Sequence, residues 1–269
     1  MITDWDKAYA NRDSISGAQQ IIETWDPDAH AFREANPCEL DISYGPEPRH
    51  VLDLFLPEGR PKGLVVFVHG GYWLLFDKNP WSHFAKGPLD HGFAVAMPSY
   101  PLAPSARLSD ISAAIGLAIE EAARRIEGPI HLAGHSAGGH LVARMITDAS
   151  PLSGPTMARI KTCVPISGLF DLRAMLKLKM NSDWKLDLDS AIAESPVFQM
   201  PKPHIKMTAW VGGSELPEFL RHTALLENAW TGCGANISSF AEGDKHHFNV
   251  IDGLKLKEHP LTKTVCDLV

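Results

Sequence analysis

Short apolar runs alternate with amphipathic stretches along most of this chain. The run from Leu64 to Val68 is continuous, β-branched and aromatic, which is typical of a strand buried on both faces. Further strands are expected at residues 92–97, 129–133, 160–166, 204–211 and 235–243. Helices are expected at residues 109–127 with Ser109 as the N-cap, from about residue 138, at 215–230 and at 254–268. This alternation predicts an α/β fold with a mostly parallel central sheet and helices on both faces.

Three segments depart from the alternation. Residues 39–56 alternate apolar and polar positions on both sides of a Gly-Pro turn, which predicts a β-hairpin. Residues 1–37 are polar with scattered aromatics and predict one or two short helices, whereas the mixed residues 170–200 predict a small cap-like insertion over a sheet edge. The sequence has no internal repeat, low-complexity tract or Gly/Ser linker, so residues 1–269 are expected to form a single domain.

Composition narrows the class of protein. The 269 residues are 45% hydrophobic and 21% charged, which is the balance of an ordinary globular protein. The net charge is −7 and no basic run occurs, which argues against a nucleic-acid partner. No stretch approaches about 18 uninterrupted apolar residues and the polar start lacks signal-peptide features, so we expect no membrane segment and a cytoplasmic location. The four cysteines form no CxxC pair, which argues against a disulfide framework or a cysteine-based zinc site.

The stretch GHSAGGH at residues 134–140 carries the first candidate chemistry. Its first five residues fit the pattern G-x-S-x-G, and they lie between an expected strand and an expected helix. That setting is the one a nucleophile elbow requires, because a sharp turn exposes the serine hydroxyl and leaves no room for side chains at the flanking glycines. The pattern therefore makes Ser136 the candidate nucleophile.

A metal site is the competing interpretation of the same stretch. His131, His135 and His140 are expected on the strand, in the turn and on the helix, respectively. They do not share one helical face, and no acidic residue nearby completes a ligand set. We therefore predict no metal here and expect His135 to pack beside the turn.

A serine nucleophile needs a base and an acid that orients the base, which follow in this order in a fold of this kind: serine, acid, histidine. Glu215 lies just past an expected strand end, where open α/β sheets gather their site residues. Asp244 and Asp171 are alternative acids, and Glu215 could instead be an acid that interacts with a helix dipole.

Two adjacent histidines compete for the role of base. His246 and His247 follow the last expected strand, and neighbours on a loop point in different directions. At most one of them should face Ser136, and the residues themselves leave the choice open.

The motif HGGYW at residues 69–73 directly follows the first buried strand, where an oxyanion loop is expected. Its glycines would let the backbone approach a substrate oxygen, although a simple Gly-Gly turn is the alternative. We expect the N–H groups of Gly71, Tyr72 and Ala137 to form an oxyanion hole.

These segments together resemble the α/β-hydrolase superfamily, and more closely its branch of HGGxW esterases and serine-type kynurenine formamidases. The matching segments are HGGYW at 69–73, SYPLAPSARLSDI at 99–111, GHSAGGHL at 134–141, GGSELPEF at 212–219 and HHFNVID at 246–252. The chain departs from many relatives at Glu215, where aspartate is common, and at Pro101, where arginine is common.

The resemblance implies specific roles for these residues. It makes His247 rather than His246 the base and Glu215 the orienting acid, with Asp244 as the alternative. It also implies hydrolysis of a small ester or arylformamide through an acyl-serine intermediate, with no metal or organic cofactor.

Aromatic residues suggest the shape of the substrate. Tyr72 and Trp73 are expected to contact it. Phe76, Trp81, Trp184, Phe198, Trp5, Tyr9 and Trp25 are further candidates for the pocket, although most of these aromatics are expected to be packing residues. Such a pocket favours a flat aryl group. The alternatives are a general short-chain carboxylesterase and a non-catalytic binding protein of the same fold. The sequence leaves the oligomeric state open, a homodimer being one alternative.

Overall fold

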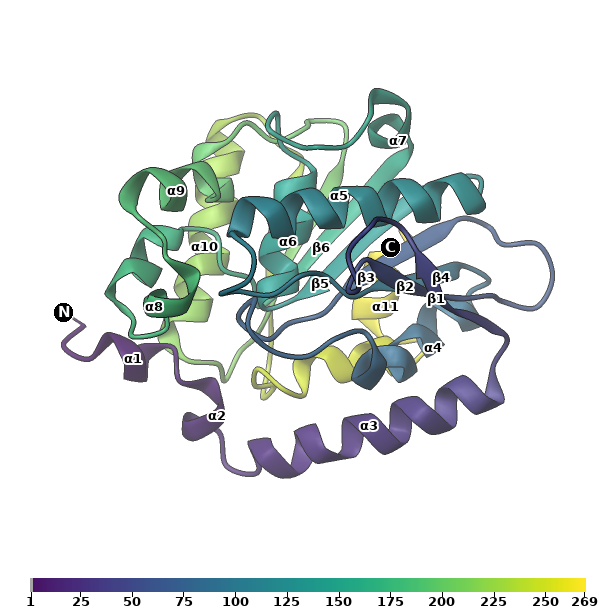
Figure 1. The fold of residues 1–269 in the computed structure, drawn as a ribbon, viewed down its shortest axis with the longest axis horizontal. Helices are drawn as coiled ribbons and strands as arrows, with labels where there is room; N and C mark the ends of the chain where they lie inside the picture. The colour runs from purple at the N-terminus through teal and green to yellow at the C-terminus, as the bar shows by residue number, and fades with distance from the viewer. Residues whose placement is uncertain (1) are drawn as a thin grey trace.

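The computed structural model describes residues 2–269, and its centre is an eight-stranded sheet (Figure 1). The strand order is β1-β2-β4-β3-β5-β6-β7-β8. The strands are β1 (Cys38–Ser43), β2 (Val51–Phe55), β3 (Leu64–Val68), β4 (Ala94–Pro98), β5 (Ile130–His135), β6 (Ile160–Ile166), β7 (Lys206–Gly212) and β8 (Ile237–Glu242). The pairs β1–β2 and β2–β4 are antiparallel, and the other five pairs are parallel. The predicted fold class is confirmed.

Alternate side chains of the central strand β3 enter two hydrophobic cores, one on each face of the sheet. Leu64, Val66 and Val68 belong to the core that is covered by α5 (Leu108–Arg125), α6 (Ala137–Met145) and α10 (Pro217–Gly232). Val65 and Phe67 belong to the core that is covered by α3 (Ala18–Ala35), η1 (Asn79–Ala85), η4 (Val250–Lys255) and α11 (Pro260–Val265). The short helix α4 (Lys86–Asp90) lies on the same side as α3 (Figure 1).

The N-terminal segment contains more helix than the sequence predicts. It forms α1 (Trp5–Ala8), α2 (Asn11–Ser14) and the 18-residue α3, instead of one or two short helices. The apolar stripe of α3 is narrow, because only Ala18, Trp25 and Ala29 are buried. Trp25 packs against Trp81 of η1 with ring centroids 4.7 Å apart. Tertiary contact thus stabilises a helix whose own pattern is weak.

Two expected helices have different boundaries. The helix predicted at 254–268 is divided into η4 and α11, and Pro260 is the first residue of α11. Proline disfavours helical backbone in the residue that precedes it, which explains the division. Helix α5 begins at Leu108 and its N-cap is Arg107 rather than Ser109. Asp110 accepts a hydrogen bond from the Arg107 N–H at 3.0 Å and so closes this end.

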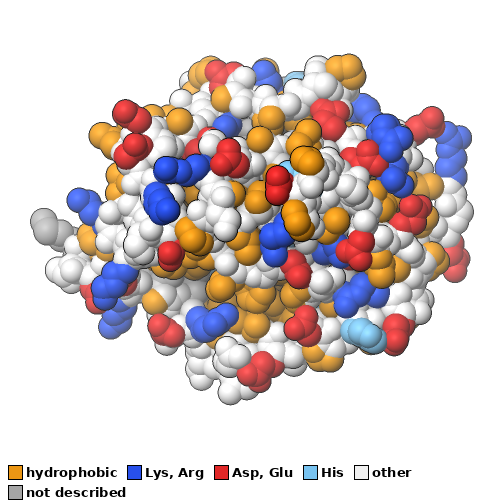
Figure 2. Space-filling model, viewed as in Figure 1, with side chains coloured by type: hydrophobic (Ala, Val, Ile, Leu, Met, Phe, Trp, Pro, Cys, Tyr) orange, Lys and Arg blue, Asp and Glu red, His pale blue; other side chains and the backbone are white. Residues whose placement is uncertain are grey.

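Residues 170–200 fold into four short elements at the end of the molecule where α1 also lies (Figure 1). These are η2 (Leu172–Lys177), α8 (Asn181–Trp184), α9 (Leu188–Ala193) and η3 (Pro196–Phe198); α7 (Gly154–Arg159) precedes β6. Of the helices formed by residues 2–269, none combines the length and apolar character that a bilayer crossing requires. On the face shown in Figure 2, acidic and basic side chains are interspersed without a continuous basic area.

Candidate active site

Ser136 occupies the turn between β5 and α6 in a strained backbone conformation. Its φ of 56° and ψ of −116° are uncommon for a residue with a side chain. A Cβ atom at Gly134 would collide with the carbonyl of Gly138, and one at Gly138 would collide with the carbonyl of Val68. The Ser136 N–H donates to the carbonyl of Ile166 at 2.8 Å and holds the turn against β6. The geometry is that of a nucleophile elbow.

Glu215 and His247 form a buried hydrogen-bonded pair. The distance from His247 Nδ1 to Glu215 Oε2 is 2.7 Å, and the side chains are 4% and 0% exposed, respectively. The other carboxylate oxygen accepts hydrogen bonds from the Gly212 N–H at 2.9 Å and from the Ser167 hydroxyl. An ionised carboxylate only accepts, so Nδ1 of His247 donates in this bond. In the neutral imidazole with this tautomer, Nε2 keeps its lone pair.

The rival residues make other contacts. Asp171 is bonded to the guanidinium of Arg173 at 2.8 and 2.9 Å. Asp244 is exposed to solvent. The ring of His246 accepts a hydrogen bond from the Phe248 N–H at 3.2 Å within its own loop. The structure therefore brings Glu215, and none of these three, to His247.

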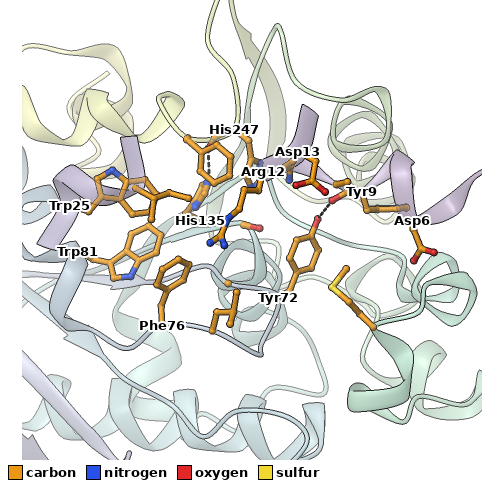
Figure 3. A pocket seen from close by; sticks show the side chains of 18 of the residues that line it. Asp6, Tyr9, Arg12, Asp13, Trp25, Tyr72, Phe76, Trp81, His135 and His247 are labelled. Carbon is orange, nitrogen blue, oxygen red and sulfur yellow. Dashed lines mark hydrogen bonds between the residues drawn. The ribbon is translucent and has the colours of Figure 1, made fainter. Parts of the chain in front are cut away.

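A cavity of about 450 Å³ connects these groups. Ser136 and His247 line it, together with Gly71 and Tyr72 of the HGGYW segment at 69–73, the expected oxyanion loop. One wall is aromatic and contains Trp25, Phe76 and Trp81 (Figure 3). Phe248 also lines the cavity. These rings also pack on one another, since Trp81 lies 4.7 Å from Trp25 and 5.8 Å from Phe76 between centroids. The wall offers a preformed apolar surface to a flat group.

The backbone of the HGGYW segment has positive φ values at consecutive positions. Gly71, Tyr72 and Trp73 have φ values of 115°, 53° and 58°. A Cβ atom at Gly71 would collide with the carbonyl of Leu75, so glycine is required there. Throughout residues 2–269, the N–H groups of Gly71 and Tyr72 have no hydrogen-bond acceptor, which leaves them available to a substrate oxygen.

Neighbouring segments hold this loop from two sides. The Trp184 indole donates to the carbonyl of Tyr72 at 2.8 Å, from α8. The Tyr72 hydroxyl donates to the carbonyl of Tyr9 at 2.6 Å, from the N-terminal segment. Beneath the loop, Tyr100 donates to the carbonyl of His69 at 2.9 Å and stacks on its ring at 4.2 Å.

Six residues predicted for the site or its pocket do not line the cavity, namely Glu215, Ala137, Trp73, Trp5, Trp184 and Phe198. Glu215 acts on the cavity through His247, to which it is hydrogen-bonded. Trp73 is fully buried, and its ring packs edge-on against His140 and Trp184. The expectation that Trp73 contacts substrate therefore does not match its position, because the loop directs this side chain into the core. Ala137 is also fully buried, and it is the first residue of α6. Of the two aromatics expected to contact substrate, Tyr72 lines the cavity.

The three histidines near the elbow have separate buried contacts. His131 contacts Thr162, His140 contacts the carbonyl of Glu194, and His135 contacts the carbonyl of His247, at 2.8, 2.7 and 2.8 Å. Burial lowers the pKa of His131 and of His140 to about 4, and it lowers the pKa of His135 well below its usual value. Neutral His135 thus donates to the backbone of His247 and supports the loop. No cluster of three His, Cys, Asp or Glu residues in the described chain is placed to hold a metal ion.

Several other residues of the site could not be predicted from sequence patterns. Asn11 and Arg12 line the cavity from α2, and Ser167 donates to Glu215 from the end of β6. Ser167 belongs to an SGLFDL segment and has a φ of 52°, which only the folded chain reveals. Polar residues in a polar N-terminal segment carry no periodic pattern that would mark them.

Comparison with known proteins agrees with this geometry. A family model described as BD-FAE matches residues 52–203, which is more than half of the chain. The chain is 26% identical to the kynurenine formamidase of Danio rerio over 86% of this chain and 81% of that protein. It is 48% identical to a provisionally named thioesterase from Silicibacter sp. TM1040, with a TM-score of 0.94 over 98% of this chain and 99% of that one. An esterase of Pyrobaculum calidifontis shares the fold at 17% identity and a TM-score of 0.69, over 93% and 92% of the chains.

Proposed function

The chain belongs to the BD-FAE family, and from that premise we propose that it hydrolyses small esters or arylformamides through an acyl-serine intermediate. The observation that carries the proposal is the buried Glu215–His247 pair in the same cavity as the strained Ser136. A serine hydroxyl is a weak nucleophile, and this arrangement supplies both the base and the group that orients it.

The acylation step uses the residues as follows. The Ser136 oxygen attacks the substrate carbonyl carbon while Nε2 of His247 takes the hydroxyl proton. The negative charge of Glu215 stabilises the imidazolium that forms. The carbonyl oxygen becomes an oxyanion and accepts hydrogen bonds from the N–H groups of Gly71, Tyr72 and Ala137.

The intermediate then collapses and releases the leaving group. His247 returns its proton to the departing alcohol or amine, and the acyl group stays on Ser136. Water attacks this acyl group while His247 takes a proton from the water. The carboxylic acid leaves, and the Ser136 hydroxyl is restored with the same proton.

The surroundings of Glu215 support its role. Its carboxylate is excluded from solvent and accepts from three donors, which are His247, the Gly212 N–H and the Ser167 hydroxyl. Three hydrogen bonds to the charged form compensate for the loss of hydration. The acid is therefore fixed in one orientation and orients His247 in turn.

The aromatic wall supports an aryl group in the substrate. The kynurenine formamidase named among the relatives makes an arylformamide the specific candidate. A short-chain carboxylic ester is the alternative, since the same acyl transfer acts on either bond.

Labelling with a fluorophosphonate probe tests the reaction class. The wild-type protein should be labelled, and the variant Ser136→Ala should not. Folded wild-type protein that takes up no label would refute the hydrolase mechanism and favour a binding protein. Comparing kcat/KM for N-formylkynurenine and for 4-nitrophenyl acetate tests the substrate class. If the formamide is not turned over, a short-chain carboxylic ester is the substrate class that remains.

A further inference from the structure

Arg12 brings a positive charge without a direct ion-pair partner to the cavity. It lines the cavity from α2, and Figure 3 shows its side chain extending between His135 and Tyr72. Within residues 2–269, its guanidinium makes neither an ion pair nor a hydrogen bond. Lys179, the other cation of the lining, lies 3.6 Å from the carboxylate of Asp6 and is thereby compensated. The charge of Arg12 is therefore available to a ligand.

Asn11 supplies a second and independent observation. Its side chain is 3% exposed and lines the same cavity. Neither Nδ2 nor Oδ1 has a hydrogen-bond partner in the described part of the chain. A buried amide that lacks partners is uncommon in folded proteins, because leaving it unpaired costs the free energy of its lost hydration. A ligand group in the cavity would complete these hydrogen bonds.

Both residues are held in a fixed relation to the oxyanion loop. The Asn11 N–H donates to the carbonyl of Tyr9 at 3.0 Å, and the same carbonyl accepts from the Tyr72 hydroxyl at 2.6 Å. Tyr9 is fully buried, and its hydroxyl donates to Glu218 at 2.8 Å. The Tyr9 carbonyl thus links helix α2 to Tyr72, whose N–H is a proposed oxyanion donor.

We propose that Asn11 and Arg12 form a carboxylate-binding subsite that selects aryl substrates carrying an anionic group. A carboxylate accepts two parallel hydrogen bonds from the guanidinium fork and can accept another from Nδ2 of Asn11. The aromatic wall of the cavity holds the aryl ring at the same time. This inference rests on the proposed esterase or formamidase function, and it specifies in addition that the substrate carries a negative charge. Asp13 also lines the cavity, so selection of a cation is the competing outcome.

Three aryl acetates test the subsite. They are phenyl acetate, 3-carboxyphenyl acetate and 3-(trimethylammonio)phenyl acetate, and kcat/KM is measured for each with wild-type, Arg12→Gln and Asn11→Leu proteins. The ratio of kcat/KM for the anionic ester to that for phenyl acetate should fall about tenfold in both variants, mainly through KM, because a charge-assisted hydrogen bond is lost. The ratio cancels differences in leaving group and in the amount of folded protein.

Lys7→Gln is the matched control. Lys7 is an exposed cation of the neighbouring α1 and does not line the cavity, so its removal changes the net charge alone. In the Lys7→Gln variant, the ratio of kcat/KM for the anionic ester to that for phenyl acetate should stay at the wild-type value. A purely structural role of Asn11 would lower all three activities together and leave the ratio unchanged, which would overturn the proposal for that residue.

The outcomes separate this inference from the proposed function. Labelling of Ser136 and hydrolysis of phenyl acetate would support the esterase function. If, in addition, both variants keep the wild-type ratio, or the cationic ester is preferred, the subsite is refuted while the esterase function stands. If nothing is labelled or hydrolysed, binding of 3-hydroxybenzoate and of phenol to Ser136→Ala protein is compared by calorimetry. A preference for the benzoate that Arg12→Gln removes would support the subsite; equal binding of both ligands would refute it.

Discussion

Nδ1 of His247 lies 2.7 Å from Oε2 of Glu215, and solvent does not reach the Glu215 side chain. Replacing this acid with alanine should lower kcat/KM by about three to four orders of magnitude. Without Glu215, nothing holds His247 in the tautomer that has its proton on Nδ1, and no negative charge stabilises the imidazolium that forms in the reaction. Steady-state hydrolysis of an aryl ester measures the effect.

Asp244→Ala is the control for this acid. Asp244 follows the next strand, β8, whereas Glu215 follows β7, and Asp244 is exposed to solvent. Its removal should leave kcat/KM within about twofold of the wild-type value, since substitutions of exposed side chains that make no buried contact have small effects. Equal losses in Glu215→Ala and Asp244→Ala would contradict the assignment of Glu215. Circular dichroism of both variants shows whether the fold is retained.

The parallel sheet and the elbow could be predicted because their signals are local. The run from Leu64 to Val68 and the spacing of glycines around Ser136 each reflect a requirement of the backbone at that place. The acid was harder to identify, because Glu215 and Asp244 both follow strands. Only the fold shows which of the two reaches His247.

The contribution of the N-terminal segment could not be predicted from its sequence. Asn11 and Arg12 have no periodic neighbours, and their place at the cavity depends on the contact of Tyr9 with Tyr72. Trp73 illustrates the opposite case. Its motif marks the oxyanion loop, but a φ of 58° in a tight turn directs the ring into the core.

Gly138 should tolerate no side chain. A Cβ atom there would collide with the carbonyl of Val68, which belongs to the neighbouring strand. Gly138→Ala should therefore destabilise the protein by about 1–3 kcal/mol and displace Ser136, with a large loss of activity. Gly154→Ala is the matched control, since its Cβ atom would meet nothing within 4 Å. Chemical denaturation of the two variants checks the difference.

Stability should fall as the pH drops from about 6.5 towards 4, because buried histidines bind protons more readily in the unfolded chain. Burial lowers the pKa of His131 to about 4, so the unfolded state binds more protons in this range and is favoured. From an unfolded pKa of about 6.5, this residue alone should lower the free energy of unfolding by about 2 kcal/mol at pH 5.

Urea denaturation of the wild-type protein and of His131→Gln at pH 7 and pH 5 tests this linkage. The variant has no group that titrates at this position, so its free energy of unfolding should fall less between the two pH values. An equal fall in both proteins would show that His131 does not contribute. His140 has a pKa of about 4 for the same reason and accounts for part of the dependence that remains.

The hydrogen bond from Trp184 to the carbonyl of Tyr72 should affect the rate of the chemical step. Trp184→Phe keeps a ring in place but removes the indole N–H, whose nitrogen lies 2.8 Å from that carbonyl. The Tyr72 peptide would lose a support beside the oxyanion hole, so kcat should fall about threefold to tenfold with little change in KM, since a hydrogen bond contributes about 1 kcal/mol. Trp210→Phe is the matched control, because it removes an indole hydrogen bond to Glu242 at 2.9 Å, and neither residue lines the cavity. Similar losses of kcat in the two variants would mean that general destabilisation, rather than the position of the oxyanion loop, sets the rate.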